Sequence, residues 1–247
     1  MPDFAIQTKG LTRMFGDFTA VDHITFNVKQ GEIFGFLGAN GAGKTTAMKM
    51  LTGLLTPTSG EAKVSGRDVY TEAESIKKNI GYMSQKFSLY DDLTAEENIR
   101  FYGGIYGIQP HELSQKAEEL LERTGLIEEQ KKLVKDLPLG WKQKLAFSIA
   151  ILHRPNIVFL DEPTGGVDPV TRRQFWEQIY EVSEQGITVF VTTHYMDEAE
   201  YCDRISIMVD GRMDALGTPA ELKQEHSAET IEEVFIKLAR SAKRGDG

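Results

Sequence analysis

The sequence predicts an α/β protein in which a block of helices is inserted between the two halves of a strand–helix core. Short apolar strand patterns alternate with helical patterns before residue 86 and after residue 155, whereas the stretch between them has only helical periodicity. The 247 residues suffice for one large domain with an inserted lobe. With 40% hydrophobic and 26% charged residues, the composition is globular and excludes disorder as the main state.

Charge, cysteine content and hydropathy exclude several classes of function. The net charge of −9 argues against a surface that attracts nucleic acid, so we expect no nucleic-acid partner. The single cysteine, Cys202, excludes a disulfide framework and a thiolate metal cluster. No apolar run approaches the roughly 18 residues that span a bilayer. The start, Met1–Phe4, lacks the basic and apolar regions of a secretory signal.

The first half of the core, residues 1–86, is predicted to begin with strands. Hydrophobic patterns predict strands over 4–9, 24–28, 32–37, 61–65 and 80–84, and a helix over 44–52. The insert, residues 87–154, is predicted to be helical. Thr94 and Glu97 form a capping box that opens a helix to about residue 106, and a later helix runs from 140 to 153.

The second half of the core, residues 155–218, returns to alternating strands and helices. Strands are predicted over 156–160 and 187–192, and Asp168 is the predicted N-cap of the helix between them. Asp210-Gly211 predicts a hairpin turn between two further strands. Residues 219–247 are predicted to form a C-terminal helical appendix, with Thr218 and Thr230 as helix caps.

A glycine-rich loop follows the strand predicted over 32–37. Residues 38–45 fit the pattern G-x-x-x-x-G-K-[ST], in which backbone N–H groups cradle phosphate oxygens at a helix N-terminus. Lys44 would place its charge on the terminal phosphates, and the Thr45 hydroxyl would bind Mg²⁺. The sequence therefore predicts a P-loop NTPase core that binds a nucleotide. The candidate nucleotide-binding residues here are Gly38, Asn40, Gly41, Gly43, Lys44, Thr45 and Thr46.

Two carboxylates, Asp161 and Glu162, follow the buried strand predicted over 156–160. The carboxyl ends of parallel strands face the ligand crevice, so Asp161 is a candidate Mg²⁺ partner. Glu162 is a candidate to orient or deprotonate an attacking water. An isolated Asp-Glu pair more often just ends a strand, but the phosphate loop upstream favours the functional interpretation.

The order of the motifs resembles the ATP-binding subunit of ABC transporters over nearly the whole chain. The phosphate loop and Asp161-Glu162 are joined by matches to the family's adenine-stacking aromatic, Q-loop, signature, D-loop and switch histidine, which are Phe15, Gln85, residues 136–143, residues 165–168 and His194. Taken singly, Gln85 would be a surface residue, His194 a structural histidine and Phe15 a core residue. Their order and spacing favour function.

The resemblance implies a fold and a mechanism. It implies a mixed or parallel central sheet, an N-terminal antiparallel β-subdomain and an inserted helical subdomain. Two copies would close head to tail around two ATP molecules, each lying between one phosphate loop and the other copy's signature, at Leu139 and Gly140. Gln85 would contact Mg²⁺ and the attacking water, Glu162 would act as base, and His194 would contact the γ-phosphate. Asp168 would contact the opposite copy.

The signature departs from the family pattern Leu-Ser-Gly-Gly, because residues 137–140 read Leu-Pro-Leu-Gly. Pro138 replaces the serine whose hydroxyl reaches the nucleotide, a loss of about 1.5–3 kcal/mol for one hydrogen bond to a charged group. The backbone N–H groups of 139–141 would still face an anion from a helix N-terminus. If the position required φ > 0, Leu139 would be strained by roughly 1–2 kcal/mol. A tolerated variant in an active ATPase and an impaired site both remain open.

With one cassette and no predicted membrane span, the resemblance implies a separate transmembrane permease subunit. The cassette would then lie in the cytoplasm against the inner face of the cell membrane. Residues 192–200 and 230–238 look like those of bacterial drug-type efflux cassettes, so we expect an exporter. Apolar residues after Gln85 either receive a permease helix or pack the helical lobe: Phe87, Leu89, Tyr90 and Leu93. The alternatives are an ABC ATPase that acts on ribosomes or DNA, and a regulatory nucleotide-binding module.

Overall fold

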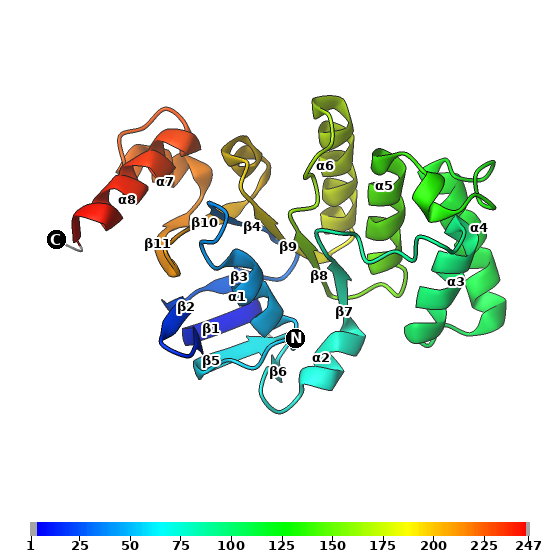
Figure 1. The fold of residues 1–247 in the computed structure, drawn as a ribbon, viewed down its shortest axis with the longest axis horizontal. Helices are drawn as coiled ribbons and strands as arrows, with labels where there is room; N and C mark the ends of the chain where they lie inside the picture. The colour runs from blue at the N-terminus through cyan, green and yellow to red at the C-terminus, as the bar shows by residue number, and fades with distance from the viewer. Residues whose placement is uncertain (1–3, 246–247) are drawn as a thin grey trace.

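The computed structural model describes residues 4–245, with a central sheet flanked by helices (Figure 1). Within that range the central sheet has the strand order β11-β10-β4-β9-β8-β7. All its neighbours pair in parallel except β11, which closes the edge as an antiparallel hairpin with β10. The strands are β4 (Ile33–Gly38), β7 (Ile80–Met83), β8 (Ile157–Asp161), β9 (Thr188–Thr193), β10 (Arg204–Val209) and β11 (Arg212–Gly217). The hairpin predicted at Asp210-Gly211 is confirmed.

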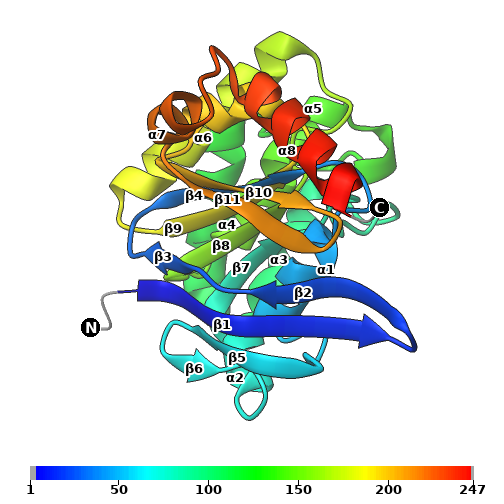
Figure 2. The same cartoon turned by 90° about the vertical axis from the view of Figure 1, so that its left-hand side faces the viewer.

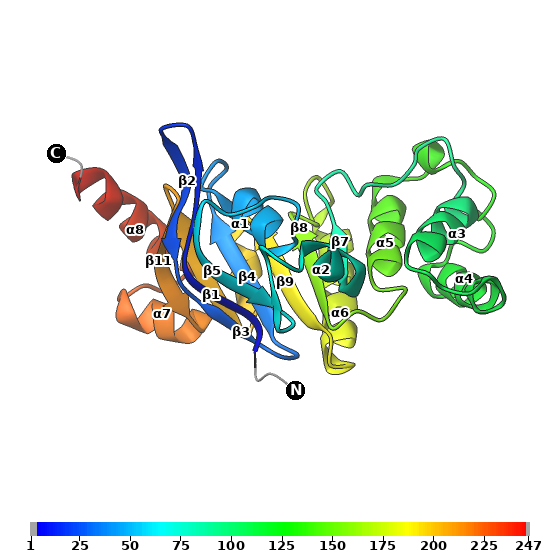
Figure 3. The same cartoon turned by 90° about the horizontal axis from the view of Figure 1, so that it is seen from below.

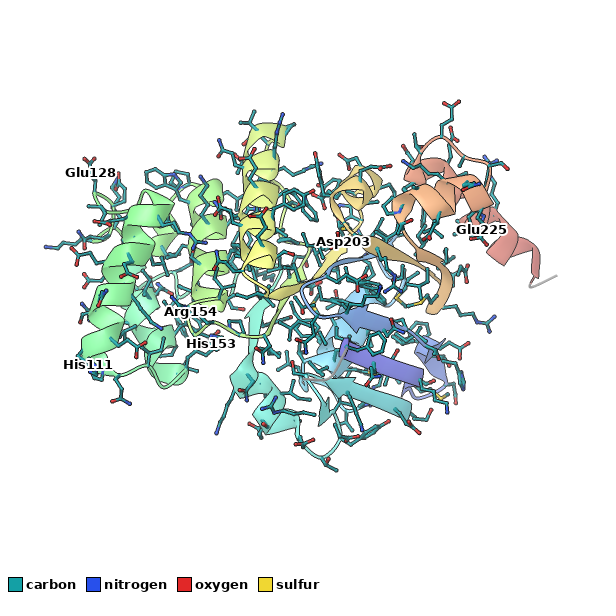
Figure 4. All side chains as sticks on the ribbon, turned by 180° about the vertical axis from the view of Figure 1, so that it is seen from behind. His111, Glu128, His153, Arg154, Asp203 and Glu225 are labelled. Carbon is teal, nitrogen blue, oxygen red and sulfur yellow. The ribbon has the colours of Figure 1, made fainter. Side chains whose placement is uncertain are left out.

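Strands β4, β9 and β8 are neighbours in this sheet and are completely buried, and a carboxylate before β10 bonds the start of β4. Every residue of β4, β8 and β9 is buried, as expected for strands covered on both faces. Asp203, labelled in Figure 4, precedes β10, and its carboxylate accepts a hydrogen bond from the Ile33 amide at 2.8 Å. This contact aligns the start of β4 with β10, and thereby fixes where β4 ends and the phosphate loop begins.

A second sheet is antiparallel and lies beside the central one, with its long strand in front in Figure 2. Its order is β2-β1-β5-β6, and β3 also pairs with β1. Its strands are β1 (Phe4–Phe15), β2 (Phe18–Ile24), β3 (Asn27–Lys29), β5 (Ser59–Val64) and β6 (Arg67–Asp68). The expected antiparallel β-subdomain is confirmed, and with it the expected fold class.

The strands predicted over 4–9 and 24–28 were wrong in extent. The first continues to Phe15 through an irregularity between Leu11 and Arg13, and the second is split between β2 and β3. Gly10, with φ of 57°, interrupts the alternation on which the prediction relied. The missed hairpin between β1 and β2 matters, because it carries Phe15 and Phe18 to the site described below.

The helices are largely where the sequence places them. They are α1 (Lys44–Leu51), α2 (Ala73–Asn79), α3 (Ala95–Ile105), α4 (Pro110–Thr124), α5 (Leu139–Ala150), α6 (Pro169–Glu184), α7 (Pro219–Glu225) and α8 (Ile231–Gly245), with short 3₁₀ segments at Val134–Asp136 and Met196–Tyr201. The capping box at Thr94 and the caps at Asp168 and Thr218 are present. Helix α2 was not predicted. Residues 246–247 of the predicted appendix lie outside the described residues.

Three clusters of buried side chains form the core. The first lies between the two sheets and α1, around stacked and tilted rings of Phe26, Phe34, Phe36, Phe159 and Phe190. The second covers the other face of the central sheet beneath α5, α6 and α8, and the third lies among α3, α4 and α5. Figure 3 shows α3–α5 at the end of the molecule opposite α7 and α8. No helix within residues 4–245 is long and apolar enough to cross a membrane.

Candidate nucleotide site at the end of the central sheet

The glycine-rich loop connects β4 to α1 and has room only for glycine at its end. Gly43 is the N-cap of α1, with φ of 101°. A Cβ atom there would lie 2.4 Å from the carbonyl oxygen of Ala20 on β2. A side chain at this position is therefore excluded both by backbone conformation and by the close approach of β2. The loop holds its amides at the positive end of α1, which is the geometry that binds phosphate.

The Lys44 side chain is 4% exposed and turns back toward the loop. Its ammonium donates to the carbonyls of Gly38 at 2.8 Å and Ala39 at 3.1 Å. It also lies 3.3 Å from Oε1 of Glu162. The ammonium is thus held in one place by two backbone acceptors and one carboxylate, where it presents a fixed positive charge at the mouth of the loop.

Asp161 and Thr45 lie side by side, as expected for two residues that bind the same Mg²⁺. The Thr45 hydroxyl donates to Oδ1 of Asp161 at 3.2 Å. Thr192, which is in parallel register with Asp161 on β9, donates to the same oxygen at 2.7 Å. Hydroxyl and carboxylate oxygens at the end of a phosphate loop are the ligands that Mg²⁺ prefers, so this pair fits the ion. No group of three His, Cys, Asp or Glu within residues 4–245 offers an alternative all-protein metal site.

Glu162 is the centre of the site. It has a positive φ of 48°, and its amide donates to the carbonyl and hydroxyl oxygens of Thr192 at 3.1 and 3.0 Å. Its Oε2 is 3.2 Å from Nε2 of Gln85 and 3.1 Å from Nδ1 of His194. A non-glycine residue in this backbone region costs roughly 1–3 kcal/mol and persists only where its neighbours hold it. Three predicted residues, Lys44, Gln85 and His194, thus contact the carboxylate of a fourth, Glu162.

A cavity of about 370 Å³ opens in front of this cluster. Phe15 lines it from the end of β1, 47% exposed, and Phe18 from the start of β2, 66% exposed. The Arg13 guanidinium lies 4.5 Å from the centre of the Phe15 ring. The other lining residues are Ala20, Asn40, Gly41, Gly43, Lys44, Thr45, Thr46, Gln85 and Glu162. The aromatic pair at one end and the phosphate cradle at the other match the two ends of a nucleotide.

The signature residues lie outside this cavity within one chain. Pro138 is the N-cap of α5, and Leu139 begins the helix at 43% exposure, with an ordinary negative φ. The strain considered for Leu139 is therefore absent. The amide of Trp141 donates to the Pro138 carbonyl at 3.0 Å, within the first turn of the helix. The first-turn amides of Leu139 and Gly140 are the ones left without an intrahelical acceptor.

Asp168 also lies outside the cavity, at the start of α6. Its carboxylate accepts from the amides of Val170 at 3.0 Å and Thr171 at 3.1 Å, and from the Thr171 hydroxyl at 2.5 Å. The hydroxyl and amide of Thr171 lower the pKa of Asp168, so it stays ionised. Within one chain this residue caps a helix at the surface. It sits near the signature helix, because a Cβ on Gly140 would lie 3.0 Å from Cγ2 of Thr171.

Sequence reasoning missed several residues of the site. The Thr192 hydroxyl bonds both the Asp161 carboxylate and the Glu162 amide. The sequence feature that could have indicated this role is a polar residue near the end of the neighbouring strand, in parallel register with Asp161. Buried Gln143 donates to the Pro163 carbonyl at 2.7 Å and so ties α5 to the segment after Glu162. Phe18 reaches the cavity only because β1 and β2 form a hairpin. No local pattern predicts the last two contacts.

Comparisons with known proteins agree with this geometry. Residues 21–165 match the family described as ABC transporter. The chain is 50% identical over 238 residues to the probable multidrug ABC transporter ATP-binding protein YbhF of Escherichia coli K12, covering 94% of this chain and 41% of that protein. It is 38% identical to the linearmycin resistance ATP-binding protein LnrL of Bacillus subtilis, covering 94% and 75%. It resembles a dimeric ATP-binding cassette solved in a post-hydrolysis state with ADP and Pi, with a TM-score of 0.79, 26% identity and coverage of 86% and 98%. The chain thus spans about two fifths of the length of the first of these relatives.

Proposed function

Because the chain belongs to the ABC transporter family, we propose that it binds and hydrolyses ATP as the subunit that drives a membrane transporter. One observation carries this proposal: the Glu162 carboxylate is held by Lys44, Gln85 and His194 at the mouth of a cavity that ends in a phosphate loop. A structural strand end would not gather these polar side chains around one nearly buried acid.

The cavity holds ATP from both ends. Phe15 stacks on the adenine, with the Arg13 cation near its ring, and Phe18 closes the same side. The loop amides and Lys44 hold the phosphates. The phosphate contacts extend along Gly38, Asn40, Gly41, Gly43, Thr45 and Thr46. Because these amides and the ammonium are fixed before the ligand arrives, binding costs little reorganisation.

Hydrolysis needs a base near the terminal phosphate. Glu162 accepts a proton from the attacking water, while Gln85 orients that water and His194 donates a hydrogen bond toward the γ-phosphate. Thr45, Asp161 and Gln85 are the residues that would hold Mg²⁺, and the ion would supply positive charge against that of the phosphate oxygens. The Thr192 hydroxyl ties the Asp161 side chain to the Glu162 backbone, since it donates to the carboxylate of Asp161 and accepts from the amide of Glu162.

A complete site requires a second cassette, because Leu139, Gly140 and Asp168 do not line the chain's own cavity. Two copies close head to tail, so that the free amides of Leu139 and Gly140 reach the nucleotide held by the opposite phosphate loop. Asp168 then contacts the other copy. The dimeric cassette among the similar structures supports this arrangement. We divide each copy into an ATPase core (1–86 and 155–218), a helical subdomain (87–154) and an appendix (219–247).

The proline at the signature gives a test of this closure. In a Glu162→Gln background, Pro138→Ser should tighten ATP-dependent dimerisation by about tenfold, since the serine hydroxyl adds one hydrogen bond to a charged phosphate. Sedimentation or light scattering with and without ATP measures the change. Pro110→Ser at the start of α4 is the matched control. Unchanged dimerisation would show that the missing hydroxyl has no effect on closure.

The transporter we propose is an exporter, with the cassette on the cytoplasmic face beside a separate permease. The names of the relatives support export: one is described as a probable multidrug protein and another as a linearmycin resistance protein. The apolar residues after Gln85 were expected either to receive a permease helix or to pack the helical lobe. Phe87 and Leu89 pack, because they lie against the core clusters. Tyr90 instead remains 49% exposed and packs edge-on to Phe101 at 4.7 Å.

The exposed apolar patch formed by Tyr90, Phe101 and Ile105 is our candidate permease contact. Phe101→Asp should abolish co-purification with the membrane polypeptide and leave the nucleotide affinity of the isolated cassette unchanged. Ile127→Asp, at an exposed apolar position elsewhere in the helical region, is the control. Retention of the complex by Phe101→Asp would exclude this patch as the contact.

The same purification separates the proposal from its alternatives. A transport ATPase co-purifies with a membrane subunit that changes its rate of phosphate release. A regulatory module would bind ATP with no stimulated hydrolysis, and a cassette that acts on ribosomes or DNA would co-purify with nucleic acid. The net charge of −9 disfavours the last outcome.

A further inference from the structure

A stack of side chains lies directly behind His194. The centre of its imidazole ring is 4.2 Å from the centre of the Tyr195 ring, at an interplanar angle of 35°. The guanidinium of Arg172 lies over the same tyrosine ring, 4.0 Å from its centre. Arg172 belongs to α6, whereas the other two residues follow β9. An aromatic ring in contact with both groups restricts where the imidazole can lie.

Arg172 also forms ion pairs with two carboxylates of the segment after Tyr195. One guanidinium nitrogen donates to Asp197 at 3.4 Å, and Nε lies 3.7 Å from Oε1 of Glu198. The Arg172 side chain is 18% exposed, and Glu198 is fully buried. The ring contact, the hydrogen bond to Asp197 and the ion pair with Glu198 together favour the position of the guanidinium over the tyrosine ring.

Glu198 connects this stack to the loop that follows Glu162. The Thr164 hydroxyl donates to Oε1 of Glu198 at 2.6 Å. Burial raises the pKa of Glu198, while the Thr164 hydrogen bond and the Arg172 charge oppose that rise. A carboxyl group in such a position is costly unless its partners are kept, so the loop at Thr164 and the helix at Arg172 are tied together.

We propose that Arg172 is a positioning residue for hydrolysis: through the Tyr195 ring it fixes the imidazole of His194, and through Glu198 it links that imidazole to the loop 164–168. The inference rests on the proposed role of His194 at the γ-phosphate. It extends that role, because α6 begins at the loop that we place against the second copy. Movement of this loop on closure then reaches His194 through packed side chains within the same chain.

The first test compares substitutions on one helix. Arg172→Met should lower kcat for ATP by about tenfold, since a misplaced group in the transition state costs rate while ground-state binding is kept. The Kd for a fluorescent ATP analogue should stay unchanged. Arg172→Lys keeps the positive charge but loses the planar group that stacks on the ring. Its kcat should lie between that of the unsubstituted protein and that of Arg172→Met. Arg173→Met is the matched control, because the Arg173 side chain is 80% exposed and its ion-pair partner Glu177 is 62% exposed.

The second test asks whether Arg172 acts through His194. In a His194→Ala background, Arg172→Met should cause no further loss of kcat, because the group that it positions is already absent. Tyr195→Leu should match Arg172→Met, while Tyr195→Phe, which keeps the ring, should retain most of the rate. These ring variants test the stack even where Arg172→Met fails to fold.

The possible failures are distinguishable. If His194→Ala lowers kcat but Arg172→Met and Tyr195→Leu do not, the positioning role is wrong and the proposed function stands. If Arg172→Met lowers kcat equally in both backgrounds, Arg172 acts elsewhere and the inference is wrong. If His194→Ala leaves kcat unchanged, the proposed role of His194 fails, and this inference falls with it.

Discussion

Glu162→Gln is expected to lower steady-state ATP hydrolysis by about 10²–10⁴-fold, the range that general-base catalysis supplies. The amide has the size of the carboxylate and keeps an oxygen for the hydrogen bonds from Gln85 and His194. It cannot accept a proton from water. Phosphate release at saturating ATP measures the effect, and a fluorescent ATP analogue measures binding.

ATP affinity should be kept or raised in the Glu162→Gln variant. The carboxylate lies 3.3 Å from the Lys44 ammonium, and removing its charge leaves that ammonium to the phosphates alone. Glu177→Gln, on an exposed face of α6, is the control and should leave both quantities unchanged. Normal turnover by the Glu162→Gln protein would remove Glu162 from the role of base.

Lys44→Ala is expected to weaken ATP binding by roughly 100-fold, since hydrogen bonds to charged groups contribute about 1.5–3 kcal/mol each. The substitution also leaves the Glu162 carboxylate, whose side chain is 10% exposed, without its nearest positive charge. An unpaired and nearly buried carboxylate beside the phosphates repels them further. Equilibrium titration with a fluorescent ATP analogue gives the change in Kd.

The matched control for this prediction is Lys49→Ala. Lys49 belongs to the same helix, but its side chain is exposed and points away from the cavity lining. It should leave ATP affinity unchanged. If Lys44→Ala and Lys49→Ala weaken ATP binding equally, the effect comes from the net charge of the protein. The position of Lys44 at the loop would then not explain phosphate binding.

The predictions that succeeded relied on local chemistry. The Thr94 capping box, the Asp168 cap and the Asp210-Gly211 turn each depend on contacts within a few residues, so a short window contains their cause. The glycine-rich loop is of the same kind, because its conformation depends on which of its residues lack a Cβ atom. Gly43 shows the limit: its positive φ is a local requirement, but the approach of Ala20 comes from another strand.

The predictions that failed needed partners distant in the sequence. The extent of β1 depends on its pairing with both β2 and β5, which no single segment reveals. Phe18 is a surface aromatic until that hairpin brings it to the cavity.

The sequence by itself determined the family, the phosphate loop and the order of the chemical groups, because these depend on residue type and spacing. The tertiary structure alone decided which groups meet. Parallel register sets Thr192 against Asp161, and the strand order places the ends of β4, β8 and β9 at one edge. Lys44, Gln85 and His194, far apart in the chain, therefore converge on one carboxylate. Such convergence depends on how strands pair across the sheet, and strand pairing is a property of the whole fold.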